Sequence, residues 1–238
     1  MKINSIDDVC KTYCMSLARR PDRREQVSQN IAKVGIEFEF FDAVDGKTLD
    51  INYDNVPCHH LRQRPGGIAI CYSFVEILKR AKELKLPHVL ILEDDVDFSE
   101  SFREDSAKFL SSVPEDWDMI YFGGNHLDHF PIQVNEHAWK CVSTRASQAI
   151  IFKETTYDYF IEKLLEFIQP NDDVFATSMR KRIFNAYTTI PPLTWQYASY
   201  SDLEEMFADY QFLKSYGESD YDRDRERFGF AAKSFDYE

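Results

Sequence analysis

The chain has 238 residues, a length that suits one globular domain built around one sizeable core. Apolar residues make up 44% of it, which excludes an intrinsically disordered chain. The formal net charge of -13 argues against a nucleic acid as the main partner, because a phosphate backbone requires a basic face.

The first half of the chain alternates strand and helix patterns. Val27, Ile31 and Val34 recur at helical spacing, as expected for a helix with one buried face. In chain order, the patterns predict a strand at residues 13–17, a helix that ends at Gly35, a strand at 38–41, a loop at 51–64 and a helix from Gly66 to Pro87.

The second half continues this alternation. Residues 88–92 are uninterrupted apolar sequence, which predicts a strand buried on both faces. Further on, the patterns predict a helix at 101–111 opened by a capping box of Ser101 and Glu104, strands at 118–122 and 149–152, a helix over 157–168 and a short helix from 171 to about 182.

This alternation predicts a single α/β domain with a mostly parallel central sheet flanked by helices. We assign residues 1–216 to that domain and residues 217–238, which are dense in charged side chains, to a C-terminal tail. The sequence says nothing of the oligomeric state.

The start of the chain lacks the apolar run of a signal peptide, and no stretch is long enough to span a bilayer. The five cysteines are odd in number and form no C-x-x-C pair, so neither a disulfide framework nor a zinc site is expected. These features predict a protein of the reducing cytoplasm.

Polar side chains follow the predicted strands, where ligands bind in open α/β sheets. The most informative group is Glu93, Asp94 and Asp95, directly after the buried strand at 88–92. Adjacent carboxylates repel each other unless a cation or hydrogen-bond donors offset them. Mg²⁺ and Mn²⁺ accept such oxygen ligands together with substrate phosphates, whereas the alternative is an acidic loop that caps a helix.

Two further groups are candidate site residues. Arg19, Arg20, Arg23 and Arg24 follow the first strand and could bind a diphosphate, although a solvated helix start explains them as well. Asp172 and Asp173 begin a predicted helix. One of them could act as a general base toward an acceptor hydroxyl, and the simpler explanation is a helix cap.

Four sequence blocks together resemble glycosyltransferase family 25, which includes lipooligosaccharide and collagen galactosyltransferases. The resemblance covers residues 13–202. The blocks are MSLARRPDRR at 15–24, FFDAVDG at 40–46, LILEDDV at 90–96 and WDMIYFG at 117–123. Each block is moderately specific, and the four in this order are strongly specific.

The resemblance implies a GT-A fold with a Rossmann-like sheet and an inverting transfer from a UDP-sugar, such as UDP-galactose, to a glycan or glycosylated acceptor. It implies a divalent cation, Mn²⁺ or alternatively Mg²⁺, held by Asp95 and Glu93. We expect Asp173, or else Asp172, to be the catalytic base. The residues that the resemblance places at the donor are Arg19, Arg23, Asp42, Asp45, Ser73, Glu93 and Asp94.

The sequence departs from the family in the block GEIGC-x-x-SH, where Gly67 and Phe74 replace the acidic residue and the histidine while Ser73 is kept. The closing block P-x-L-x-x-Q…SD is matched loosely by residues 191–196 and 201–202. These departures leave open a member that binds glycans or partners without catalysis. A nucleotidyltransferase is disfavoured because no glycine lies between Leu17 and Val34.

Overall fold

The structure, a computed structural model, describes residues 2–203 and 205–215, without the side chains of residues 127, 128 and 215. The predicted tail at 217–238 lies outside the described residues. The helices are α1 (Pro21–Val34), α2 (His59–Arg62), α3 (Pro65–Glu83), α4 (Phe102–Ser112), α5 (Glu154–Leu165) and α6 (Asn171–Arg180). Short 3₁₀ turns occur at Ile6–Asp8, Gly46–Thr48, Tyr53–Asn55 and Gln211–Ser215.

The strands form one large sheet and three two-stranded ribbons. The large sheet has eight strands in the order β2 (Glu39–Asp42), β1 (Thr12–Ser16), β3 (His88–Glu93), β10 (Ala149–Lys153), β5 (Met119–Tyr121), β11 (Ala186–Thr188), β8 (Trp139–Lys140) and β7 (Ile132–Gln133). The ribbons pair β12 (Thr194–Gln196) with β4 (Val96–Phe98), β13 (Ser199–Ser201) with β14 (Met206–Ala208), and β6 (Asn125–His129) with β9 (Ser143–Arg145).

The predicted mostly parallel sheet is confirmed. Strands β10 and β8 are antiparallel to both of their neighbours, and the other six of the eight strands share one direction. The register pairs Met15 of β1 with Glu93 of β3, and Ser16 of β1 with Asp42 of β2. The carboxyl ends of these three strands therefore meet at one edge, where the acidic group emerges.

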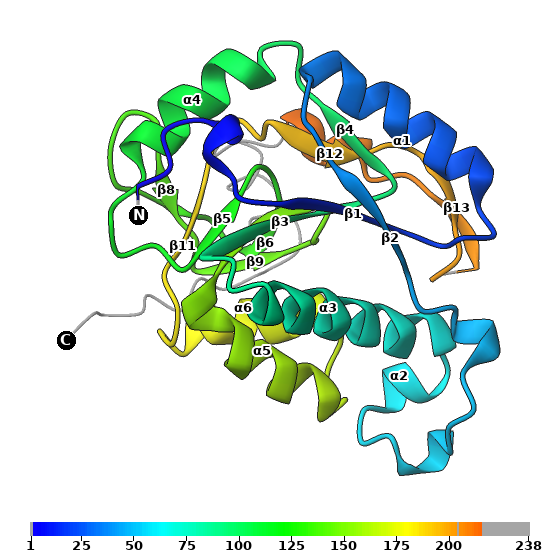
Figure 1. Cartoon of the computed structure of the whole chain (residues 1–238). Coiled ribbons are helices and arrows are strands. Elements are labelled where there is room, and N and C mark those ends of the chain that lie inside the picture. Colours follow the sequence, from blue (N-terminus) through cyan, green and yellow to red (C-terminus); the bar gives the residue numbers. More distant parts are fainter. Residues whose placement is uncertain (1, 204, 216–238) are drawn as a thin grey trace.

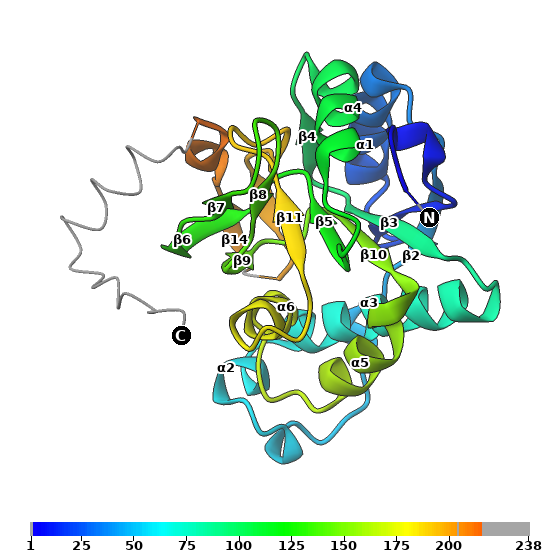
Figure 2. The ribbon, with the colours of Figure 1, turned by 90° about the vertical axis from the view of Figure 1, so that its left-hand side faces the viewer.

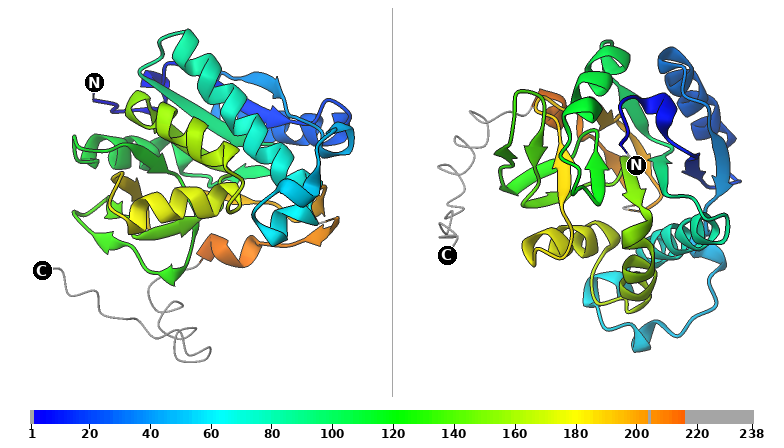
Figure 3. Two further views of the ribbon diagram at one scale, coloured as in Figure 1. Left: turned by 90° about the horizontal axis from the view of Figure 1, so that it is seen from below. Right: turned by 60° about the vertical axis from the view of Figure 1, so that its left-hand side comes forward.

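Helices cover both faces of the sheet, as Figures 1 and 2 show. Helices α1 and α4 lie on one face and α3, α5 and α6 on the other (Figure 3). The central strand β3 contributes side chains to the hydrophobic cores on both faces of the sheet. Leu90 and Leu92 pack on the side of α1 and α4, and Val89 and Ile91 pack on the side of α3, α5 and α6. Its uninterrupted apolar sequence is explained by this burial on both sides.

Most predicted elements are present, with a few differences. Gly35 ends α1 with a φ of 60°, a left-handed conformation that glycine adopts without strain. The predicted capping box at Ser101 is not formed, because its side chain makes no capping hydrogen bond at the start of α4. The predicted loop at 51–64 contains one 3₁₀ turn and the single-turn helix α2.

One glycine lets the chain pass close to the sheet near the acidic group. A Cβ atom on Gly123 would lie 2.1 Å from the carbonyl oxygen of Thr194, so only glycine fits there. The backbone N–H groups of Leu193 and Thr194 both donate to the carbonyl of Phe122. This crossing brings β12, and with it Gln196, to the end of β3.

We expect Phe74→Ala to destabilise the fold by about 3–5 kcal/mol, the usual cost of removing a buried aromatic ring. Phe74 is fully buried, and its ring packs edge-on against Phe152 and Phe175. Denaturant unfolding measures the loss. Leu84→Ala is the control, because Leu84 is 54% exposed and its truncation should change stability by about 0.5 kcal/mol or less.

Candidate functional site

Two cavities meet at the carboxyl end of β3. Cavity A has a volume of about 200 Å³ and lies among the ends of β1 and β2 and the start of α3. Cavity B, of about 310 Å³, lies among the end of β3, the turn after β9, the start of α6 and the β13–β14 hairpin. The residues that line both are Ile70, Glu93, Asp95, Gln196, Ser201 and Leu203.

Glu93 and Asp95 form the shared acidic wall of the two cavities. The Nε2 atom of Gln196 lies 3.4 Å from an oxygen of each carboxylate. Glu93 also accepts a hydrogen bond from the Ser147 hydroxyl at 2.5 Å. Burial, and then the charge of Asp95, raises the pKa of Glu93 to about 8 from an ordinary 4.5.

Asp94 points away from this pair and toward β1. It accepts a 2.6 Å hydrogen bond from the Ser16 hydroxyl and lies 3.0 Å from Nη2 of Arg23. Burial raises the pKa of Asp94 to about 6 even though Arg23 acts in the opposite direction. Asp94 therefore has protein partners, and it lines cavity A without reaching cavity B.

Arg23 forms ion pairs with two of the three carboxylates of the acidic group. Its Nη2 atom lies 2.9 Å from Asp95 and 3.0 Å from Asp94, and its side chain is buried. Burial acts against the guanidinium charge, but the carboxylates of Asp95 and Asp94 outweigh it and raise the pKa of Arg23 above its ordinary value. Proline at the first position of α1 fixes the turn that carries Arg23.

The acidic wall fits a divalent cation. One carboxylate oxygen of Asp95, Oδ1, is buried and has no hydrogen-bond partner among the described residues. Mg²⁺ and Mn²⁺ take one or two carboxylates and complete their shell with water and phosphate oxygens. In the described part of the chain no three His, Cys, Asp or Glu side chains gather as metal ligands, so Glu93 and Asp95 would hold such an ion together with a substrate.

The other residues expected at the donor fall into two groups. Arg19 and Asp45 line cavity A and pair with each other at 2.6 Å. Asp42 lines neither cavity, because its side chain is 73% exposed and pairs with Arg24. Ser73 is fully buried at the wall of cavity A. Its hydroxyl accepts from the backbone of Val44, which fixes the loop after β2 against α3.

Asp172 and Asp173 both line cavity B but have different partners. Asp173 is ion-paired to Arg145 at 2.6 Å. Asp172 accepts from the backbone N–H of Ala146 at 3.4 Å and from the N–H of Asp173 at 2.9 Å. Burial, and then the charge of Asp173, raises the pKa of Asp172 above its ordinary value. Arg145 acts in the opposite direction on Asp172. A carboxylate with a raised pKa is a better proton acceptor than one whose charge is held in a close ion pair.

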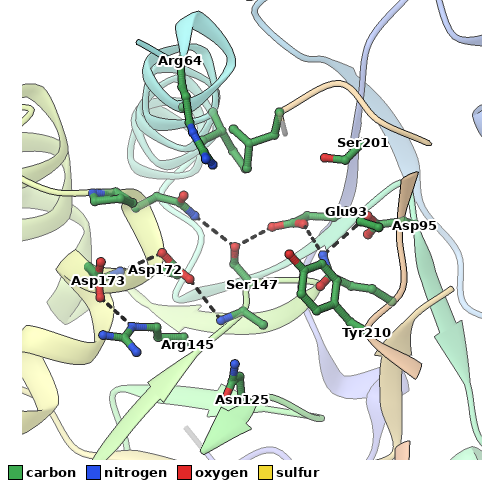
Figure 4. A pocket seen from close by; sticks show the side chains of 18 of the residues that line it. Arg64, Glu93, Asp95, Asn125, Arg145, Ser147, Asp172, Asp173, Ser201 and Tyr210 are labelled. Atoms are coloured by element: carbon green, nitrogen blue, oxygen red, sulfur yellow. Dashed lines mark hydrogen bonds and ion pairs between the residues drawn. The ribbon is translucent and has the colours of Figure 1, made fainter. Parts of the chain in front are cut away.

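A hydrogen-bond chain connects the acidic wall to the start of α6. The Ser147 hydroxyl donates to Glu93 and accepts from the side-chain amide of Asn171 at 3.0 Å. Figure 4 shows Ser147 between Glu93 and Asp172, with Asn125 facing the same space. Sequence reasoning missed Ser147, Asn171 and Arg145, which carry no motif. Gln196 and Asp202 could have been found from the loosely matched closing block.

Comparison with known proteins places the chain in context. A family model described as "Glycosyltransferase family 25 (LPS biosynthesis protein)" matches residues 9–178. A "Glycosyltransferase 25 family member" of Drosophila pseudoobscura pseudoobscura is 35% identical over 130 residues, which are 48% of this chain and 20% of that protein. The matched region thus spans about a fifth of the length of such relatives.

Two human relatives are similar at the same level. "Procollagen galactosyltransferase 2" is 29% identical over 129 residues, 48% of this chain and 21% of the relative. "Inactive glycosyltransferase 25 family member 3" is 31% identical over 135 residues, 50% of this chain and 22% of the relative. A solved glycosyltransferase involved in glycosylation of the major capsid of PBCV-1 aligns with a TM-score of 0.47 and 8% identity, covering 82% of this chain and 95% of that one.

None of the helices in the described ranges has both the length and the apolar composition that crossing a membrane requires.

The raised pKa values predict how stability of the free protein depends on pH. Glu93 titrates near 8 in the folded protein and near 4.5 when unfolded, so the folded state binds its proton more tightly. This contribution to stability is complete below pH 4.5 and is lost as the pH rises toward 8.

Thermal unfolding across this pH range, without added metal, measures the effect. We expect Glu93→Gln to flatten the decline in melting temperature toward high pH. The exposed Glu100→Gln serves as the control and should keep the slope of the unaltered protein. Equal slopes for Glu93→Gln and the unaltered protein would show that Glu93 has an ordinary pKa.

Proposed function

The chain belongs to glycosyltransferase family 25, and on that premise we propose that it transfers a hexose, galactose or a close relative, from a UDP-sugar to an acceptor hydroxyl on a glycan or a glycosylated protein. The observation that carries this proposal is the meeting of two cavities at Glu93 and Asp95. A donor in cavity A and an acceptor in cavity B would place the reacting atoms at the wall that the two share.

The charge of cavity A supports a requirement for a divalent cation. Its lining includes three cationic side chains but six carboxylates, namely Asp45, Glu93, Asp94, Asp95, Asp202 and Glu205. A diphosphate would be repelled by this surplus of negative charge. A cation held by Glu93 and Asp95, Mn²⁺ by family resemblance, would offset the charge that the diphosphate gains as it leaves.

The reaction that we propose inverts the anomeric carbon. The acceptor oxygen forms a bond to that carbon on the face opposite the diphosphate, while the carbon–oxygen bond to the diphosphate breaks and its electron pair leaves with the phosphate. Asp172 takes the proton of the acceptor hydroxyl. The sequence favours Asp173, but its ion pair with Arg145 makes it the weaker candidate, and Asp173 would instead position the turn after β9.

The alternative of a catalytically degenerate member also has support. At the two positions where the chain departs from the family, Gly67 packs against Leu61 and Phe74 lies in the core. One of the similar human relatives carries the word "inactive" in its name. The intact acidic group and Arg23 favour the enzyme, and release of UDP from UDP-galactose with Mn²⁺ separates the two functions.

We predict that Asp95→Ala lowers kcat/KM by about 10²–10³-fold or more, the usual scale for losing a main electrostatic contribution to the transition state. Binding of UDP should lose its dependence on Mn²⁺, as followed by titration calorimetry. The matched control is Asp97→Ala, two residues further on, because Asp97 lines neither cavity. UDP binding that stays Mn²⁺-dependent in Asp95→Ala would refute the assignment of Asp95.

A second prediction distinguishes the two candidate bases. Asp172→Asn should lower kcat by about 10²–10⁴-fold, the range for removing a general base, and leave the Kd for UDP nearly unchanged. Asp173→Asn should lower kcat less, since it removes an ion pair rather than the proton acceptor. Single-turnover rates with saturating donor measure both. The assignment is reversed if Asp173→Asn is the more damaging change.

A further inference from the structure

Asp202 is held by two arginines at the edge of cavity A. Its Oδ1 atom lies 2.8 Å from Nη1 of Arg19, and its other oxygen pairs with Arg20. Arg19 and Asp202 both line the cavity. Two oxygens of one anion, each held by a different guanidinium, are also the arrangement in which arginines bind a phosphate group.

The arginines of cavity A are already bound by carboxylates of the chain itself. Arg23 is buried against Asp94 and Asp95, as described above. Arg19 donates through Nε to Asp45 at 2.6 Å in addition to its pair with Asp202. The side chain of Arg19 is 36% exposed, so a ligand in the cavity can reach it. A diphosphate that binds Arg19 through these same N–H groups has to replace a carboxylate.

Of the two carboxylates on Arg19, Asp202 is the one on a hairpin that lies outside the central sheet. It directly follows β13, which pairs with β14 alone within the described residues. Three apolar side chains of this hairpin, Tyr200, Met206 and Phe207, are 51%, 58% and 64% exposed. Leu203, next to Asp202, is half-buried and lies beside Gly66 at the start of α3. Asp45, in contrast, begins a 3₁₀ turn and accepts from the backbone of Lys47.

The position of Asp202 connects this ion pair to both cavities. Ser201 and Leu203, the residues on either side of it, line cavities A and B. Figure 1 shows β13 beside α1, whose preceding turn supplies Arg19 and Arg20. Release of Asp202 would therefore move the residues that separate the proposed donor cavity from the proposed acceptor cavity.

We infer that Asp202 is an internal competitor of the donor diphosphate: it occupies Arg19 and Arg20 in the free protein and is displaced when a nucleoside diphosphate binds. This inference rests on the proposed function for its choice of ligand. Ion pairs between partly exposed groups contribute little net free energy, so a diphosphate can replace this one at low cost. The exchange frees the hairpin only when the donor cavity is filled.

The test compares the binding of two probes, UDP and inorganic pyrophosphate, each with Mn²⁺, by titration calorimetry. Asp202→Asn keeps the shape of the side chain but removes the competing charge, and it should lower the Kd for both probes by about two- to five-fold. Asp22→Asn is the matched control. Asp22 also pairs with Arg20, but its side chain is 65% exposed and lines neither cavity, so both Kd values should stay unchanged.

Each outcome decides between the inference and the proposed function. Weaker or unchanged binding by Asp202→Asn, in a protein that transfers sugar from a UDP-sugar, overturns the inference and leaves the function standing. Tighter pyrophosphate binding without any UDP binding supports the inference and refutes the donor class. If neither probe binds any of the proteins, both the inference and the proposed donor are wrong.

Discussion

Mutual repulsion among Glu93, Asp94 and Asp95 is the constraint on which the rest of the site depends. Three carboxylates at the end of a buried strand cannot all remain charged without partners. Their partners come from distant segments: Arg23 precedes them by seventy residues, and Gln196 follows by a hundred. These carboxylates thus contact both the first turn of α1, through Arg23, and β12, through Gln196.

The same charges connect stability with ligand binding. A proton on Glu93, whose pKa is raised to about 8, relieves part of the repulsion in the free protein at neutral pH, and Arg23 offsets the charge of Asp94. A divalent cation on Glu93 and Asp95 would relieve it in another way, and it would let cavity A accept an anion in spite of its carboxylates. Buried carboxylates lower the stability of the unliganded fold. They would be useful in a site where a bound cation attracts a diphosphate.

The departures from the family block at 66–74 have a physical explanation in the packing. A Cβ atom on Gly67 would lie 2.7 Å from Leu61, and Phe74 completes an aromatic cluster under the sheet. Gly67 and Phe74 are therefore packing positions in this chain, while the hydroxyl of Ser73 accepts a hydrogen bond from the backbone of Val44 in the loop after β2. The change affects the wall near α3 and leaves the acidic group intact.

The sequence by itself determined the strand and helix order, the burial of β3, the acidic group at its end and the family, because these depend on local periodicity and contiguous motifs. It predicted that Arg19 and Arg23 follow β1, but it did not show that they bind different carboxylates. Only the tertiary structure showed that Asp172 and Asp173 have different partners, and only it brought Gln196, Ser147 and Asp202 to the site. Those choices depend on contacts between residues far apart in the chain, and local patterns carry no information about such pairs.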